Sequence, residues 1–475
     1  MGDPYQAGEP YADTVAPMTG LLDDLNAIGF GGKPIDDREM MMEKLIAITA
    51  SLPDDSKARL KLSQLIINTL NSSLQHPPMS YMGDQFKYRQ PDGSLNSFIT
   101  PQLGAAGTPY AKTCRSAKKL QGVRPDPGLL FDLLLSREKG VFKENPAGIS
   151  AMLFYHATII IHDVFRTSRK DANISDTSSY LDLAPLYGSS MEDQVAIRTM
   201  SEGLLKPDTF HEIRLLGQPP GVNVILVLYS RFHNYVADML LKINEGGRFS
   251  LQPFDKDDPK EKAAAFAKQD HDLFNTARLV VGGMYMNISL HDYLRGLTNV
   301  HHSDSTWTLD PRIEIDASFG QDGVPRGVGG QVSAEFNLLY RFHPAISQRD
   351  EKWIDDLFTK EIFPDIGKPL DQLDLVEFLQ GVAKFESSVP VDPSKREFGG
   401  MKRGPNGRFK DGDLVASLKA SIEDPAGMSP NASFRSSEDI TTFSSAGHFG
   451  PRMVPKALRI VEILSILQAR KWYAD

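Results

Sequence analysis

The sequence predicts a mostly α-helical protein with very little strand. In several segments apolar residues recur at three- and four-residue spacing, as the buried face of a helix requires. The segment 148–167 is apolar almost throughout and is long enough to form a buried helix. Strand signals are short and scattered, for example around Ile313–Ile315. These three observations indicate a large helical body around one extended core.

The expected helices follow one another along most of the chain. The first spans about 55–72, where the acidic and hydroxyl side chains of residues 54–56 can cap its N-terminus. The other expected helices are 148–167, Val222–Ile243, Lys260–Val281, Val332–Phe342, Glu351–Lys360, Asp371–Phe385 and Val454–Lys471. Segments 389–412 and 424–450 are rich in Gly, Pro, Ser and basic residues, so we expect surface loops packed on the body.

Composition excludes several classes of protein. The 475 residues include 52 Lys and Arg against 61 Asp and Glu, a net charge of −9, and this balance argues against a nucleic-acid partner. The single cysteine, Cys114, rules out an internal disulfide and a thiolate metal cage. No apolar run reaches the roughly 18–20 residues of a transmembrane helix. With no signal peptide at the N-terminus, we expect a cytoplasmic protein, and association with lipid bodies or membrane surfaces stays open.

Motif searches narrow the chemistry further. The sequence has no His-Glu-x-x-His helix, no Gly-x-Ser-x-Gly elbow and no Walker loop, which weakens hydrolase and nucleotide-binding interpretations. Among the eleven histidines, His162 lies within the apolar segment 148–167, and His343 follows Tyr340 by three residues. On one helix, spacing i,i+3 puts an imidazole and a phenol on the same face. An imidazole that binds haem iron beside an oxidisable phenol is one interpretation, and an ordinary core pair is the other.

Three motifs together support a family resemblance. They are Glu335-Phe-Asn-Leu-Leu-Tyr-Arg-Phe-His-Pro344, His162-Asp-Val-Phe-Arg-Thr-Ser168 and Ser178-Ser-Tyr-Leu-Asp-Leu-Ala-Pro-Leu-Tyr-Gly188, with Ser230-Arg-Phe-His-Asn234 between them in the expected order. The chain resembles the cyclooxygenase-like branch of the animal haem peroxidase superfamily. The specific likeness is to the fungal fatty-acid dioxygenases, that is, the psi-factor-producing oxygenases and linoleate diol synthases. We therefore expect residues 1–50 to be an N-terminal extension and residues 51–475 a haem dioxygenase domain.

The resemblance implies a role for each motif residue. His343 would be the proximal ligand of haem b, Tyr340 the radical-forming tyrosine, and His162 the distal acid–base group. A hydroperoxide would activate the haem, which would oxidise Tyr340. The tyrosyl radical would take hydrogen from an unsaturated C18 fatty acid such as linoleate, and O2 would add at carbon 8 or 10. A homo-oligomer is compatible with this scheme.

Departures from related peroxidases refine the expectation. In halide-oxidising members an arginine and a Glu-Met pair stand where this chain has Leu215, Gln218 and Pro219. The resemblance therefore implies non-covalent haem and favours an oxygenase. Two alternatives stay open: a haem peroxidase that uses small reductants, and an inactive, truncated helical relative.

The resemblance also suggests a calcium loop. The expected oxygen ligands are the side chains of Asp163, Ser178 and Asp182 and the carbonyl of Tyr180, which are hard donors of the kind that suit calcium. Ala184 stands where the family has a hydroxyl ligand. Two outcomes are open: calcium binds with water as a substitute, or the loop is a metal-free remnant.

The substrate channel and the extent of the chain complete the expectations. Leu294 and Leu297 lie where the family's acyl channel passes and are candidates for setting which carbon meets Tyr340. No Arg or Lys stands out as the carboxylate anchor. Relatives continue further, so we expect a truncated C-terminal end. Cys114 precedes the motifs, so we expect no cytochrome P450 domain and no isomerase activity.

Overall fold

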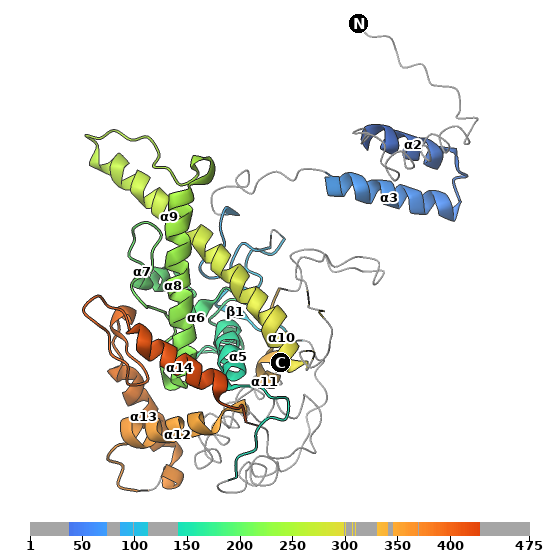
Figure 1. Cartoon of the computed structure of the whole chain (residues 1–475). Helices are drawn as coiled ribbons and strands as arrows, with labels where there is room; N and C mark the ends of the chain where they lie inside the picture. Colours follow the sequence, from blue (N-terminus) through green and yellow to red (C-terminus); the bar gives the residue numbers. More distant parts are fainter. Residues whose placement is uncertain are drawn as a thin grey trace. The chain divides into compact units, whose positions relative to one another are not determined.

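The computed structural model describes residues 38–73, 86–97, 99–112, 141–298, 330–340, 345–368 and 370–427, together with Val300, Thr306 and Leu309. The chain forms two compact units, Met1–Gly83 and Asp84–Asp475 (Figure 1). The strand signal at 313–315 and the helix expected at 454–471 lie outside the described residues. Helices dominate the described part of both units, which confirms the predicted fold class.

In the first unit two helices pack against each other: α2 (Arg38–Ser51) and α3 (Lys57–Ser73). Ile48 of α2 and Ile66 of α3 are buried, although α3 leaves several other apolar side chains exposed. The helix α3 confirms the one predicted over 55–72.

Three long helices build the core of the second unit: α5 (Ala151–Val164), α8 (Pro220–Ile243) and α9 (Pro259–Asn287). All three were predicted, with ends that differ by a few residues. Each begins at a recognisable cap. The Ser150 side chain accepts the N–H of Met152, and Pro220 and Pro259 stand at first helical positions where no N–H is needed. The helix α8 packs against both α5 and α9 (Figure 1).

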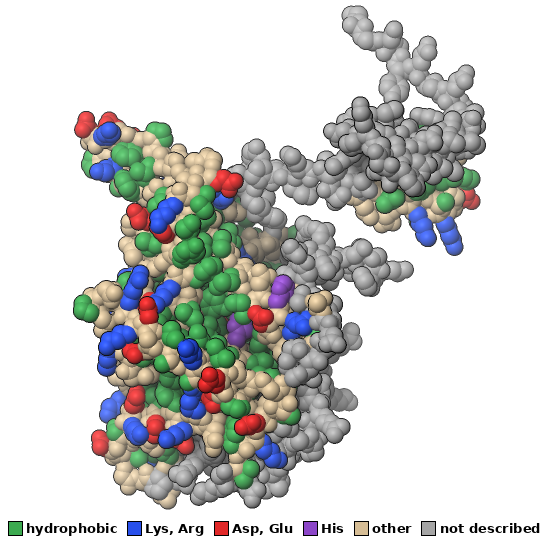
Figure 2. All heavy atoms as spheres, viewed as in Figure 1, with side chains coloured by type: hydrophobic (Ala, Val, Ile, Leu, Met, Phe, Trp, Pro, Cys, Tyr) green, Lys and Arg blue, Asp and Glu red, His purple; other side chains and the backbone are tan. Residues whose placement is uncertain are grey.

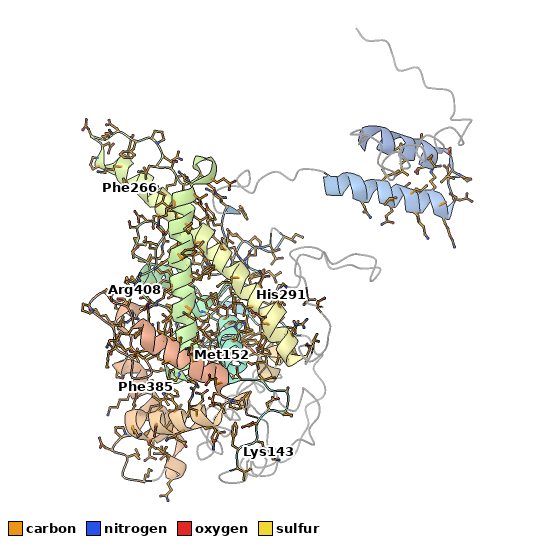
Figure 3. The ribbon with its side chains drawn as sticks, in the orientation of Figure 1. Lys143, Met152, Phe266, His291, Phe385 and Arg408 are labelled. Atoms are coloured by element: carbon orange, nitrogen blue, oxygen red, sulfur yellow. The ribbon has the colours of Figure 1, made fainter. Side chains whose placement is uncertain are left out.

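The helix α9 does not end as a regular α-helix. It continues into the π-helical turn η5 (Ile288–Tyr293) and the short α10 (Leu294–Leu297). Figure 3 labels His291 in this turn and Met152 on α5. A π-helical turn holds more residues than an α-helical turn, so it rotates the side chains that follow it. Here the turn ends on Tyr293, whose side chain is buried.

The helices that follow pack around a second apolar cluster. It contains α12 (Gln348–Asp356), the π-helical η9 (Leu357–Ile362) and α13 (Leu375–Ser388), close to the two predicted helices in this region. The ring of Phe358 stacks on those of Phe363 and Phe378.

The basic segment 389–412 packs on the body, as predicted. Arg396 is buried and donates to the His211 carbonyl, while Arg403 donates to the carbonyls of Pro207 and Asp208. These arginines therefore serve the fold by satisfying backbone carbonyls. The helix α14 (Asp411–Glu423) follows and packs on α8 and α5.

Short elements connect these helices. They are the antiparallel strands β1 (Thr108–Pro109) and β2 (Ile174–Ser175), the α-helices α6 (Ala184–Tyr187), α7 (Met191–Ile197) and α11 (Ala334–Leu339), and the 3-10 turns η3 (Ile213–Gly217), η4 (Glu245–Gly247), η10 (Leu370–Gln372) and η11 (Pro393–Lys395). On the face seen in Figure 2, acidic and basic side chains are intermixed. Among the described helices, none combines the length and apolarity that crossing a membrane requires.

Candidate active site

Two sequence motifs that lie far apart in the chain meet in the second unit. The Asn337 side-chain amide donates a hydrogen bond of 3.2 Å to the Thr167 hydroxyl, 170 residues away. The ring of Phe336 packs edge-on against that of Phe165, with 5.3 Å between centroids. These contacts fix α11, which leads into Tyr340, against the chain that leaves α5.

The helix that leads into Tyr340 is shorter than predicted. It ends at Leu339, and Tyr340 is its C-cap, with φ −80° and ψ 80°. The Tyr340 N–H still bonds to the Phe336 carbonyl at 2.8 Å, which closes the last turn. The helix expected over 332–342 therefore ends at Leu339 among the described residues. The alignment of Tyr340 with His343 stays a prediction. His343 itself lies outside the described residues, and its role as haem ligand stays a prediction.

Tyr340 pairs with a second tyrosine that the sequence reasoning missed. The phenol oxygens of Tyr340 and Tyr293 lie 2.5 Å apart in a hydrogen bond. Tyr293 is only 8% exposed and comes from the end of the π-helical turn. Tyr340 also contacts the ring of Phe336 at 5.0 Å. The phenol predicted to form the radical thus packs against an aromatic, largely apolar cluster, and its hydroxyl bonds to a tyrosine from another helix.

Both phenols of this pair are neutral near neutral pH. Burial raises the pKa of Tyr340 to about 12, although the hydrogen bond from Tyr293 acts in the opposite direction. Burial raises the pKa of Tyr293 still further, far above its usual range. Removal of an electron from Tyr340 must therefore be accompanied by loss of its proton. The Tyr293 hydroxyl bonds to the Tyr340 oxygen, so this hydrogen bond changes when that proton leaves.

Leu294 and Leu297, the residues predicted to line the acyl channel, follow Tyr293 on α10. Leu294 is half-buried and Leu297 is 36% exposed. The contact to Tyr340 is made by the neighbouring Tyr293 instead. The roles of the two leucines therefore stay predictions.

His156, on α5, packs against the ring of Tyr293. Its ring is 5.4 Å from that of Tyr293 and 5.6 Å from that of Tyr285. Ser289 donates its own proton to the Tyr285 carbonyl, so its oxygen accepts from His156 Nε2 at 2.9 Å. Burial lowers the pKa of His156 to about 4, and the imidazole is neutral at physiological pH. His156 is therefore a residue of the core.

His162, the predicted distal histidine, stands in the last turn of α5 and is half-buried. The Arg214 guanidinium donates to the carbonyls of His162 at 3.4 Å and Phe165 at 3.3 Å. These are carbonyls that the end of a helix leaves without intrahelical partners. The helix end that presents the imidazole is thereby anchored to the chain that precedes α8.

Arg214 is held in turn by a buried carboxylate. Glu212 is 3% exposed and accepts from Arg214 at 2.7 Å. Although burial opposes ionisation, the positive charge of Arg214 holds the pKa of Glu212 far below its usual range. The sequence reasoning considered Leu215 and missed Arg214 beside it. The signal available in the sequence was that Arg214 lies next to Leu215, the position where related peroxidases have an arginine.

The predicted calcium ligands cluster, and their oxygens take part in hydrogen bonds except Asp182 Oδ1, which has an ion-pair contact alone. The Asp163 carboxylate is fully buried and accepts the N–H groups of Leu183 at 3.0 Å and Ala184 at 2.7 Å. Ser178 donates its hydroxyl to Asp182 at 2.5 Å. Leu183 has a left-handed φ of 56°, a strained conformation for a non-glycine residue, and the bond to Asp163 stabilises it.

A cation also faces this cluster. The Arg89 Nε lies 3.1 Å from Asp182 Oδ1, and Arg89 Nη2 donates to the Tyr180 carbonyl at 3.4 Å. No group of three or more acidic, His or Cys side chains suited to a metal ion occurs among the described residues. The donor set, as arranged here, does not fit a calcium site.

The motif 230–234 supports the fold. His233 is fully buried, its Nδ1 accepts from the Tyr187 hydroxyl at 2.8 Å, and its Nε2 donates to the Gly203 carbonyl at 2.9 Å. Arg231 forms a two-pronged ion pair with Asp208. This motif therefore ties α8 to α6 and to the loop between α7 and η3.

The described residues fit one side of a haem site. His162 is an imidazole at the end of an apolar helix, a donor of the type that haem proteins use. Leu215 and Gln218 are buried, and neither they nor Pro219 offers a carboxylate or thioether for covalent attachment. This donor set suits non-covalent haem.

Comparison with known proteins identifies close relatives of the chain. No protein-family model matches it. It is 44% identical over 485 residues to a bifunctional dioxygenase–epoxy alcohol synthase of Pyricularia oryzae, covering 99% of this chain and 40% of that protein. It is 43% identical to a linoleate 10R-lipoxygenase of Aspergillus fumigatus, covering 96% and 39%. A linoleate diol synthase of Gaeumannomyces graminis is 42% identical, covering 96% and 38%.

The chain therefore spans about 40% of the length of these curated relatives. Among solved structures, peroxidase A from Dictyostelium discoideum has a TM-score of 0.44 at 14% identity, covering 79% of this chain and 90% of that one.

Proposed function

We propose that this chain, which belongs to the family of the fungal psi-producing oxygenases and linoleate diol synthases, is a haem-dependent fatty-acid dioxygenase. Its substrates would be O2 and an unsaturated C18 acid such as linoleate, with a hydroperoxide as activator. The product would be a hydroperoxide at carbon 8 or 10. The observation that carries the proposal is the half-buried Tyr340 phenol, bonded to Tyr293, in a chain 42–44% identical to such oxygenases over nearly its whole length.

The chain's residues would divide the work as follows. His343 would hold the haem iron, and the His162 imidazole would accept and return the peroxide proton as a general acid–base. When bound, the haem would supply the one-electron oxidising power that peroxide provides. Arg214 supports this arrangement because it anchors the carbonyls at the end of α5.

Tyr340 would carry the radical. Its phenoxyl oxygen would take a hydrogen atom from an allylic or bis-allylic carbon, leaving a carbon radical and an intact phenol. Addition of O2 to that carbon would form a peroxyl radical, which would recover the hydrogen atom from Tyr340 and regenerate the phenoxyl. The apolar residues packed against Tyr340 support this role, because they limit the contact of the radical with water.

The decisive experiment substitutes the phenol oxygen. Tyr340→Phe should keep the haem absorption band and lose linoleate-dependent oxygen uptake, with the product identified by mass spectrometry. Tyr235→Phe, at a 60% exposed position on α8, is the matched control and should behave as wild type. Normal hydroperoxide formation by Tyr340→Phe would remove the radical role. Consumption of peroxide by the wild type without oxygen uptake would instead favour a peroxidase.

A further inference from the structure

We propose that the Arg89 guanidinium, and not a calcium ion, is the cation that balances the acidic pair Asp163 and Asp182. The family resemblance predicted calcium at this place, with Ser178 and the Tyr180 carbonyl as further ligands. The contacts of these groups point to a loop whose counter-charge is a side chain of the protein itself.

The first observation is the use of the oxygens. Both carboxylate oxygens of Asp163 accept backbone N–H groups, from Leu183 and Ala184. The Ser178 hydroxyl donates to Asp182 at 2.5 Å and accepts the Tyr180 N–H at 3.3 Å. A calcium ion would have to displace these donors or share their acceptors. Ala184, which lacks the family's hydroxyl, contributes its N–H in place of an oxygen ligand.

The second observation is that Arg89 reaches two of the predicted ligands at once. Its Nε lies 3.1 Å from Asp182 Oδ1 and its Nη2 lies 3.4 Å from the Tyr180 carbonyl oxygen. Asp182 is 6% exposed, so its charge needs a nearby counter-charge. A planar guanidinium can serve a carboxylate and a carbonyl together, which a single ammonium does less well.

The third observation is the charge balance. The buried Arg278 interacts electrostatically with both Asp163 and Asp182. With Arg89 it brings two guanidinium groups to the two carboxyl groups. A divalent ion would enter a cluster that already holds two cations, at the cost of repulsion from both guanidinium groups.

The position of Arg89 is fixed by its own segment. Arg278 donates to the carbonyls of Arg89 at 3.0 Å and Gln90 at 3.4 Å. Gly93 has a left-handed φ of 78°, and a Cβ there would overlap Ser178, so this segment lies directly on the loop. A cavity of about 210 Å³ is lined in part by Arg89, Asp182 and Arg278.

The test uses the purified full chain and two readouts other than activity. After gel filtration in calcium-free buffer, elemental analysis should find far less than one calcium per chain. The midpoint of thermal unfolding should be the same in EDTA and in millimolar calcium. Retention of one calcium per chain, or a midpoint that rises with calcium, would overturn the proposal.

Variants test the role of Arg89 directly. Arg89→Met should lower the unfolding midpoint by several degrees, whereas Arg169→Met, at an exposed surface ion pair, should change it little. Asp182→Asn should cost less stability in the Arg89→Met background than in the wild type, because the unpaired carboxylate is then removed. Additive losses, or an Arg89→Met midpoint equal to that of the wild type, would contradict the proposal. Should Arg89→Met fail to fold, the calcium content and calcium response of the wild type decide the question.

Discussion

The phenols of Tyr293 and Tyr340 share a 2.5 Å hydrogen bond although they lie 47 residues apart in the chain. Tyr293 comes from the π-helical end of α9, and Tyr340 from the residue that caps α11. The bond therefore joins the end of a π-helical turn to the C-cap of a short α-helix. Because Tyr293 is buried and Tyr340 is half-buried, a change in the protonation or oxidation of one phenol acts directly on the other.

Tyr293→Phe should slow oxygenation without abolishing it. The substitution removes the hydrogen bond that lowers the pKa of Tyr340, so that pKa should rise above about 12. A lost hydrogen bond of roughly 0.5–1.5 kcal/mol corresponds to about a 3- to 10-fold lower rate. The measurement is the initial rate of oxygen uptake with linoleate at equal haem content. Tyr229→Phe, which removes another buried phenol oxygen, is the control, and equal rates for the two variants would contradict a special role for Tyr293.

His162→Ala should reduce activation by peroxide. If the imidazole shuttles the peroxide proton, its removal costs about 10²- to 10⁴-fold in the rate of peroxide-dependent oxidation. The rate is measured by stopped-flow absorbance with a small reductant. His271→Ala, at an exposed position on α9, controls for loss of a histidine. A wild-type rate in the His162 variant would show that the proton passes elsewhere.

Local pattern predicted the helices of the core well but not the way in which they end. The apolar run of α5 and its Ser150 cap are local signals, and the helix formed between residues 151 and 164. The helix before Tyr340 was expected to continue to Phe342, yet it stops at Leu339. The Tyr340 phenol bonds to Tyr293 and its backbone leaves the helix, and such a tertiary contact is invisible to periodicity.

Two further features depended on partners from distant segments. Leu294 and Leu297 were named as channel residues because they lie where the family's acyl channel passes, and that role stays a prediction. The π-helical turn that faces Tyr293 toward Tyr340 has no signal in the local pattern. The predicted calcium ligands have the right residue types, and they do cluster. Arg89, which pairs with Asp182 from almost a hundred residues earlier, carries no local signal that it belongs there.

His156→Gln should weaken the dependence of stability on pH. The pKa of His156 is lowered from 6.5 to about 4 by burial among Tyr285, Tyr293 and Ser289, so the unfolded chain binds a proton that the folded chain does not. Folding stability from this group is present above pH 6.5 and is lost as pH falls toward 4. Between pH 6.5 and about pH 5 the loss is about 2 kcal/mol.

Glutamine can keep the hydrogen bond to Ser289 without titrating. The free energy of unfolding of the variant, measured with urea, should therefore fall less than that of the wild type as the pH is lowered. His233, whose pKa is also lowered to about 4, titrates in both proteins and cancels in the comparison. Identical pH profiles for variant and wild type would mean that His156 is not held neutral.

Gly221→Ala should destabilise the crossing of α5 and α8. A Cβ at Gly221 would overlap the ring of Tyr155, which is fully buried and held by a 2.7 Å hydrogen bond from its hydroxyl to Asp350. Because that ring cannot move aside, overpacking should cost about 1–3 kcal/mol in the free energy of unfolding, measured with urea. Gly283→Ala is the matched control: it lies inside α9 with open space around a Cβ, so it should gain about 0.5–1 kcal/mol from helix propensity. Equal stability of the two variants would show that the helices do not meet as closely as Gly221 allows.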